Sequence, residues 1–205
     1  MKLLSDKRVD PHWKLDTLRL EPCGEQWLKP GLRKYSCQLT LDTNTVNRKL
    51  KLSDNNKTVT AGTEEQTFDY RQQLLCREGL TGRCYWEVER SGKVHISVSY
   101  RGIGKTGNSK DYRFGYNDQS WSLNCSEIRS YSVCHNKRVT HLSSSVSDRV
   151  GVYVDCPAGI LSFYRVSSDS LIHLYTFNTT FTEPLYPGFS LESGYWSGSV
   201  SLCSV

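Results

Sequence analysis

The sequence predicts an all-β fold, in which two antiparallel sheets pack face to face as a bent sandwich. Three observations carry this prediction: apolar residues recur with period two, the apolar runs are short, and clusters of turn-forming residues separate them. In the run VHISVSY, the apolar side chains Val94, Ile96 and Val98 fall on one face, and His95 and Ser97 fall on the other. Such strands bury one face each, so two sheets must cover one another.

Further runs along the chain repeat this pattern. RVGVYVD and ILSFYRV flank the turn sequence CPAG and therefore predict a hairpin over residues 149–166. CYWEVE, LIHLYTF and PLYPGFSL predict additional strands. Because Trp86 and Trp121 lie within strand-like runs, we expect both to be core residues.

The first 35 residues depart from the alternating pattern. Leu15, Leu18, Leu20 and Cys23 have the spacing of a leucine-rich-repeat strand, which makes residues 1–35 a candidate repeat remnant followed by a connector. A chance match of four positions is the alternative. A single repeat cannot bury its own apolar face, so this interpretation predicts that the chain belongs to a larger multidomain protein.

Composition and charge exclude several classes of function. The net charge of +5 is mild and the basic residues alternate with acidic ones, so we expect no nucleic-acid partner. No apolar run reaches the length of a membrane span, and the charged start is unlike a signal peptide. We expect a cytoplasmic protein without membrane insertion, in which Cys37, Cys84 and Cys156 are free thiols. No cysteine or histidine cluster has metal-ligand spacing, and we expect no cofactor.

From residue 36 onward the chain resembles the PRY-SPRY, or B30.2/SPRY, family. The PRY half, residues 36–80, carries LTLDTNT and LKLSDNNKTVT; the SPRY half, residues 81–205, carries GRCYWEVE, NDQSWSL, VDCPAGILSFY and PLYPGF. LDT stands where the family commonly has LDP, and VDC stands where LDY is usual. The resemblance implies a concanavalin-like jelly-roll sandwich that serves as a non-catalytic recognition module.

The junction GEQWLKPGLRKYSCQLTLD is similar to the one that precedes this domain in fish NLR-type receptors, where NACHT and leucine-rich-repeat domains come first. The resemblance therefore implies the C-terminal recognition domain of a cytosolic innate-immune receptor. Stonustoxin-like pore-forming toxin subunits and tripartite-motif ubiquitin ligases carry similar domains, and both remain alternatives.

Two enzymatic alternatives have sequence features in their favour. Gly104, Lys105 and Thr106 match the second half of a phosphate-binding loop, but Ser99 stands where its first glycine is required, and no helical pattern follows. Glu87 and Glu89 share one face of a predicted strand, as a glycosidase carboxylate pair could, but no nucleophile signature or sugar-binding aromatic residue lies near them in sequence. We expect no enzymatic activity.

The loops are where a rigid β-scaffold places its recognition residues. The family resemblance nominates Asp69 after the PRY half, Asn124 and Ser126 beyond the QSW motif, and Tyr195 and Trp196 before the last strand. Some relatives carry tryptophans at the positions of Asn124 and Ser126, so the ligand is expected to differ.

Residue type adds three more candidates from the same loops: Tyr70, Arg71 and Arg129. Trp196 and Arg71 are the leading individual candidates, because tryptophan and arginine are enriched at interaction hot spots. The alternative for Trp196 is that it folds back over the sheet edge. The expected ligand is a protein or peptide bound at one end of the sandwich.

Overall fold

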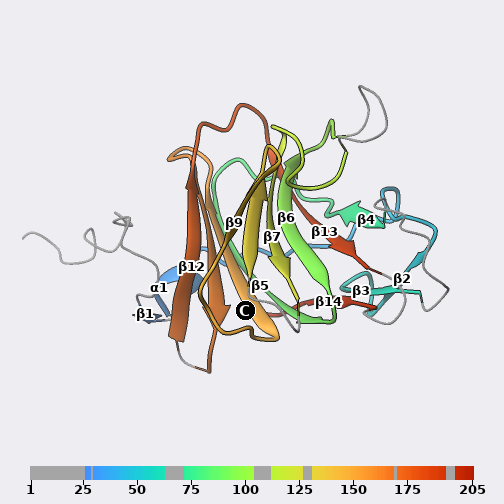
Figure 1. The fold of residues 1–205 in the computed structure, drawn as a ribbon, viewed down its shortest axis with the longest axis horizontal. Coiled ribbons are helices and arrows are strands. Elements are labelled where there is room, and N and C mark those ends of the chain that lie inside the picture. The colour runs from blue at the N-terminus through green and yellow to red at the C-terminus, as the bar shows by residue number, and fades with distance from the viewer. Residues whose placement is uncertain are drawn as a thin grey trace, which may run out of the picture.

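The computed structural model describes residues 26–28, 30–62, 72–103, 112–126, 131–168, 170–192 and 197–205. In these ranges two antiparallel sheets pack against each other (Figure 1). The larger sheet runs in the order β1 (Gln26–Leu28), β12 (Ser170–Asn178), β11 (Ile160–Val166), β10 (Arg149–Asp155), β5 (Arg83–Ser91), β14 (Ser199–Leu202), β3 (Thr58–Ala61), β2 (Leu50–Ser53). The smaller sheet runs in the order β4 (Gln73–Leu75), β13 (Leu185–Leu191), β6 (Val94–Tyr100), β7 (Ser120–Cys125), β8 (Ser132–His135), β9 (Arg138–His141). The predicted all-β sandwich is confirmed.

The core between the sheets follows the period-two pattern. Trp86 from β5 and Trp121 from β7 are each only 2% exposed, which confirms that both are core residues. Ile96 and Val98 of β6 lie in the same apolar cluster. The predicted hairpin is also confirmed, because β10 pairs with β11 from Val150 opposite Arg165 to Asp155 opposite Ile160.

A second, smaller apolar cluster covers the outer face of the larger sheet. Its members are Leu32, Tyr85, Tyr153, Tyr164, Val166 and Leu171. Leu32 comes from the short helix α1 (Pro30–Arg33), which therefore packs on the sheet beside β12 (Figure 1). The leucine-rich-repeat positions Leu15 to Cys23 lie outside the described residues, so the boundary at residue 35 stays a prediction.

The structure also bears on the phosphate-loop alternative. Ser99 belongs to β6, is fully buried, and pairs with Ser120 and Tyr186. A residue held in the middle of a sheet cannot form the tight turn that opens a phosphate loop.

Within the described residues, no helix is long and apolar enough to cross a membrane.

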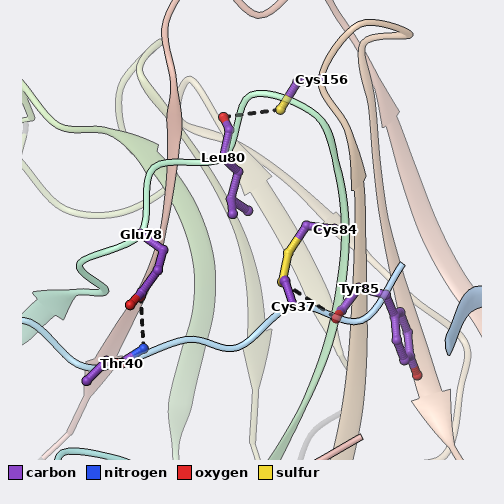
Figure 2. The surroundings of a disulfide bond; sticks show 7 residues. All are labelled: Cys37, Thr40, Glu78, Leu80, Cys84, Tyr85 and Cys156. Carbon is purple, nitrogen blue, oxygen red and sulfur yellow. Dashed lines mark hydrogen bonds between the residues drawn. A yellow bond between two sulfur atoms is a disulfide. The ribbon is translucent and has the colours of Figure 1, made fainter. Parts of the chain in front are cut away.

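Cys37 and Cys84 form a disulfide, so the prediction that both are free thiols was wrong (Figure 2). The cause is a pairing between segments distant in sequence. The Cys37 amide donates to the Tyr85 carbonyl at 3.1 Å, and the Tyr85 amide donates to the Tyr35 carbonyl at 2.8 Å. This places the Cα atoms of Cys37 and Cys84 5.6 Å apart, within the usual range for a disulfide.

Cys156 lies close to this disulfide and is a free thiol, as predicted (Figure 2). Its sulfur is 3.4 Å from the Leu80 carbonyl oxygen. Disulfides are typical of oxidising compartments. The cytoplasmic location stays a prediction.

Candidate functional site

The described ends of three nominated loops meet at one end of the smaller sheet. Val94 at the start of β6 pairs with Cys125 of β7 and with Leu191 of β13. The Leu191 amide in turn donates to the Gln72 carbonyl at 3.0 Å. The flanks of loops 63–71, 127–130 and 193–196 are thereby brought together, although they are far apart in the sequence.

The loop 104–111 leaves from the opposite end of β6, but its far flank returns to the same area. The Tyr112 carbonyl accepts a hydrogen bond of 2.9 Å from Gln73 Nε2 in β4. The three nominated loops and the loop 104–111 therefore each have at least one described flank near the same end of the smaller sheet.

A row of polar side chains crosses the outward face of the sheet at this end. In register, Gln73 pairs with Ser190, Ser190 with His95, His95 with Asn124, and Asn124 with Ser132. The neighbours along each strand, such as Ile96 and Leu123, point into the core instead. Period-two alternation therefore places these five polar residues, which we call the polar row, on the face turned away from the core.

The polar row is held by a chain of hydrogen bonds. Ser97 Oγ donates to Ser122 Oγ at 2.9 Å, and Ser122 Oγ donates to Asn124 Oδ1 at 3.2 Å. Asn124 Nδ2 then donates to Ser132 Oγ at 3.2 Å. Both ends of the Asn124 amide are engaged, so its orientation is fixed before any ligand arrives.

His95 gives the polar row a neutral centre. Burial lowers the pKa of His95 to about 4, and the nearby cations Lys93 and Arg113 act in the same direction; Glu192 and Asn124 act to raise it. Lys93 and Glu192 are themselves an exposed ion pair at 2.5 Å. At neutral pH the row therefore offers uncharged hydrogen-bonding groups, with an ion pair close to its middle.

A separate segment covers the rest of this face. Phe114 is 2% exposed, and Gly115 bonds to the sheet twice: its amide donates to Ser120 Oγ at 2.8 Å, and its carbonyl accepts from Cys134 Sγ at 3.1 Å. Ser97, Ser99, Ser120 and Ser122 are consequently buried, whereas His95, Asn124 and Ser190 are partly exposed. The accessible part of the outward face is therefore the part beside the loop flanks.

Two of the eight predicted site residues are described. Asn124 lies in the polar row and Ser126 directly follows β7 at the same end, and both are partly exposed. The other six lie outside the described residues: Asp69, Tyr70, Arg71, Arg129, Tyr195 and Trp196. Sequence reasoning missed His95 and Ser190 as site residues, although the alternation in VHISVSY already placed His95 on the polar face.

The described residues contain no group of three histidine, cysteine, aspartate or glutamate side chains that could hold a metal ion. Glu87 is fully buried: it accepts a hydrogen bond from the Tyr85 hydroxyl at 2.9 Å and forms an ion pair with Arg149 at 2.7 Å. A carboxylate locked in this way is unsuited to act as one of a glycosidase pair.

Comparison with known proteins agrees with this architecture. The SPRY domain profile matches residues 83–203. Stonustoxin subunit beta from Synanceia horrida is 41% identical over 166 residues, which cover 77% of this chain and 24% of the toxin subunit. Tripartite motif-containing protein 14 from Mus musculus is 32% identical over 196 residues, which cover 90% of this chain and 43% of that protein.

Two solved structures are similar over 86% of this chain. The stonustoxin structure has a TM-score of 0.74 at 37% identity, with 28% of its chain covered. The crystal structure of the TRIM65 PSpry domain has a TM-score of 0.73 at 28% identity, with 95% of its chain covered. This chain spans less than half the length of the curated relatives named above. It belongs to the SPRY domain family.

Proposed function

We propose that this chain is a non-catalytic interaction module that binds a protein or peptide through the loops at one end of the smaller sheet. The convergence of the flanks of four loops on the polar row supports this proposal most strongly. Hydrogen bonds on both sides of Asn124 hold its side chain in the polar row in place, which lowers the entropy lost on binding. The proposal includes no nucleic-acid partner and no membrane insertion by this domain.

The finer proposal is that the module is the C-terminal recognition domain of a cytosolic innate-immune receptor. Its support is the resemblance of the segment before residue 40 to the junction in NLR-type receptors. The relatives, of which this chain matches 24% and 43%, support a role as one part of a larger chain. Immunoblotting of fractionated tissue tests it: a cytosolic protein several times larger than this chain is expected, and a secreted protein contradicts it.

A toxin subunit is the second candidate function, because stonustoxin subunit beta is 41% identical to this chain. In that case the domain binds a receptor on a cell surface. Incubating the labelled chain with intact cells separates the two candidates: saturable surface binding favours the toxin, and its absence favours the receptor.

Replacing Arg71 and Trp196 together by alanine is expected to reduce partner capture at least tenfold, because each residue is a hot-spot type and hot spots cost about 2 kcal/mol or more when truncated. Quantitative mass spectrometry of proteins retained by the immobilised chain measures this loss. The midpoint of thermal unfolding should stay unchanged, which separates loss of contact from loss of fold.

The matched control is Lys51→Ala with Thr60→Ala, because both residues are exposed on the larger sheet, on strands β2 and β3. This pair should capture the partner as well as the unaltered chain does. Equal capture by the Arg71 and Trp196 variant would remove those two loops from the site.

A further inference from the structure

The outer edge of β9 is open in the part of the chain that the structure describes (Figure 1). β9 is the last strand of the smaller sheet, and the described strand that it pairs with is β8. All four of its residues are exposed, and Val139, at 44%, is the most exposed large apolar side chain among the described residues. β9 is therefore an edge to which a further strand can be added.

The opposite edge of the same sheet, β4, is closed by the chain itself. The Leu75 amide donates to Thr45 Oγ1 at 2.9 Å, and the Leu75 carbonyl accepts a hydrogen bond from the Asp42 amide at 2.9 Å. These contacts use main-chain groups that would otherwise be available to another strand. β9 has no such cover from the described residues.

The register of β8 and β9 shows which main-chain groups point outward. The Leu142 amide donates to the Tyr131 carbonyl at 2.8 Å, so these two residues form a hydrogen-bonded pair. Hydrogen-bonded and non-hydrogen-bonded pairs alternate along an antiparallel ladder. Val139 and His141 are therefore in non-hydrogen-bonded pairs with β8. Their N–H and C=O groups point away from β8, toward the open edge.

The turn that joins β8 to β9 holds the edge in place. It consists of Asn136 and Lys137, whose φ angles are 47° and 65°, as a type I′ turn requires. The Asn136 amide donates to the Asn117 carbonyl at 3.0 Å, and the Lys137 amide donates to the Gly115 carbonyl at 3.1 Å. A strand fixed in this way loses little conformational entropy when it pairs with a partner.

The charges of β9 and its turn indicate the kind of partner. Between Glu127 and Asp148 the sequence contains no acidic residue, and Lys137 directly precedes Arg138 at the start of β9. Arg138 is exposed and forms no ion pair with the residues that the structure describes. A second copy of β9 would bring like charges together, whereas an acidic strand would neutralise them.

The two faces of β9 differ in character. Val133 of β8 lies in the core, so Thr140, which is opposite to it, and Arg138, two residues away, lie on the core-side face. Val139 and His141 lie on the other face. A strand laid beside β9 alternates in the same way. Acidic side chains are favoured next to Arg138, and apolar ones next to Val139.

We propose that the open edge of β9 binds an extended segment of another protein, in which acidic and apolar side chains alternate, as an additional antiparallel strand. The main-chain groups of Val139 and His141 form the hydrogen bonds, and Arg138 neutralises an acidic side chain. The antiparallel direction follows the pairing of the neighbouring strands β7, β8 and β9. This edge lies outside the loops proposed for partner binding and does not depend on them.

Nuclear magnetic resonance of the ¹⁵N-labelled chain tests the proposal. The probe is a blocked peptide of about six residues that alternates glutamate and valine. As it binds, the amide signals of Val139 and His141 should shift, and their hydrogen exchange should slow. Two control peptides should bind at least about tenfold more weakly. One has lysine in place of glutamate, and the other has N-methylated valines, whose N–H groups would face β9 in an antiparallel pair.

Two substitutions separate the main-chain contacts from the charge. Val139→Pro deletes an N–H group that points outward, and proline is tolerated at such an edge position, so the pairing with β8 should persist. Arg138→Glu reverses the charge and should make the chain prefer the lysine peptide. Each should weaken binding of the acidic peptide at least about tenfold. The matched control, Lys51→Glu on the exposed side of edge strand β2, should leave it unchanged.

Several outcomes would overturn the proposal. Equal binding of the N-methylated peptide would exclude strand pairing, and full binding by either variant would exclude this edge. Absence of binding to the unaltered chain would mean that the basic residues protect the edge from pairing. A dimer that Val139→Pro dissociates would assign the edge to a second copy. The variant with Arg71→Ala and Trp196→Ala should still bind the peptide, which keeps this test separate from that of the loops.

Discussion

Replacing Cys37 and Cys84 together by alanine is expected to lower the free energy of unfolding by about 4 kcal/mol, because the disulfide closes a long loop in the unfolded chain. The two cysteines are 47 residues apart in sequence, and the loop between them holds most of the PRY half. For a protein of ordinary stability, this loss is about a quarter or more of the total free energy of unfolding.

Urea unfolding with and without a reductant measures this contribution. The unaltered chain should unfold at lower urea in the reductant, whereas the double variant should unfold at the same urea concentration in both conditions. Cys156→Ala is the matched control: its thiol lies near the disulfide, and burial raises its pKa to about 11, so it is a poor nucleophile at neutral pH. If the unaltered chain unfolds at the same urea concentration with and without the reductant, the disulfide does not contribute to stability.

Lowering the pH from 7.5 to 5 is expected to remove about 2 kcal/mol of stability through His95 alone. In the folded chain the pKa of His95 is lowered to about 4, whereas an unfolded histidine titrates near 6.5. Between these values the unfolded chain binds a proton that the folded chain does not. The stability is therefore complete above pH 6.5 and decreases as the pH falls toward 4.

Because glutamine cannot titrate, the free energy of unfolding of His95→Gln should change less between pH 6.5 and pH 4 than that of the unaltered chain. Urea unfolding at a series of pH values gives this profile of stability against pH. The charged groups that bear on His95 are Lys93, Arg113 and Glu192, and none of them is altered by this change. Ser190→Ala is the control, because Ser190 lies next to His95 in register. This variant should shift the free energy of unfolding by the same amount at every pH and leave its dependence on pH unchanged. A His95→Gln profile as steep as that of the unaltered chain would contradict a neutral His95.

Local patterns predicted the strands well, because each strand buries one face and therefore alternates in sequence. The runs around Trp86 and Trp121 show this most clearly, since their apolar residues are those that the sandwich buries. The hairpin of β10 and β11 could likewise be predicted, because both strands and their turn are contiguous in the sequence.

Features that depend on contacts between distant segments could not be predicted in this way. The disulfide requires the segment at Cys37 to pair beside β5, and neither cysteine carries a local sign of that pairing. The polar row could not be predicted either, because its members come from five strands that become neighbours only through the strand order of the smaller sheet. The helix α1 covers a face of tyrosines, although the segment 30–35 has the composition of a connector.

Hydrogen exchange of the chain, alone and with its captured partner, tests most directly where the partner binds. Amide protons at Gln72–Gln73, Asn124–Ser126, Tyr131–Ser132 and Glu192 should exchange more slowly in the complex, because these residues form and flank the polar row. Amides of β2, β3 and β14 should exchange at the same rate with and without the partner. Slower exchange confined to β2, β3 and β14, with no change at the polar row, would place the interaction on the larger sheet and contradict the proposed site.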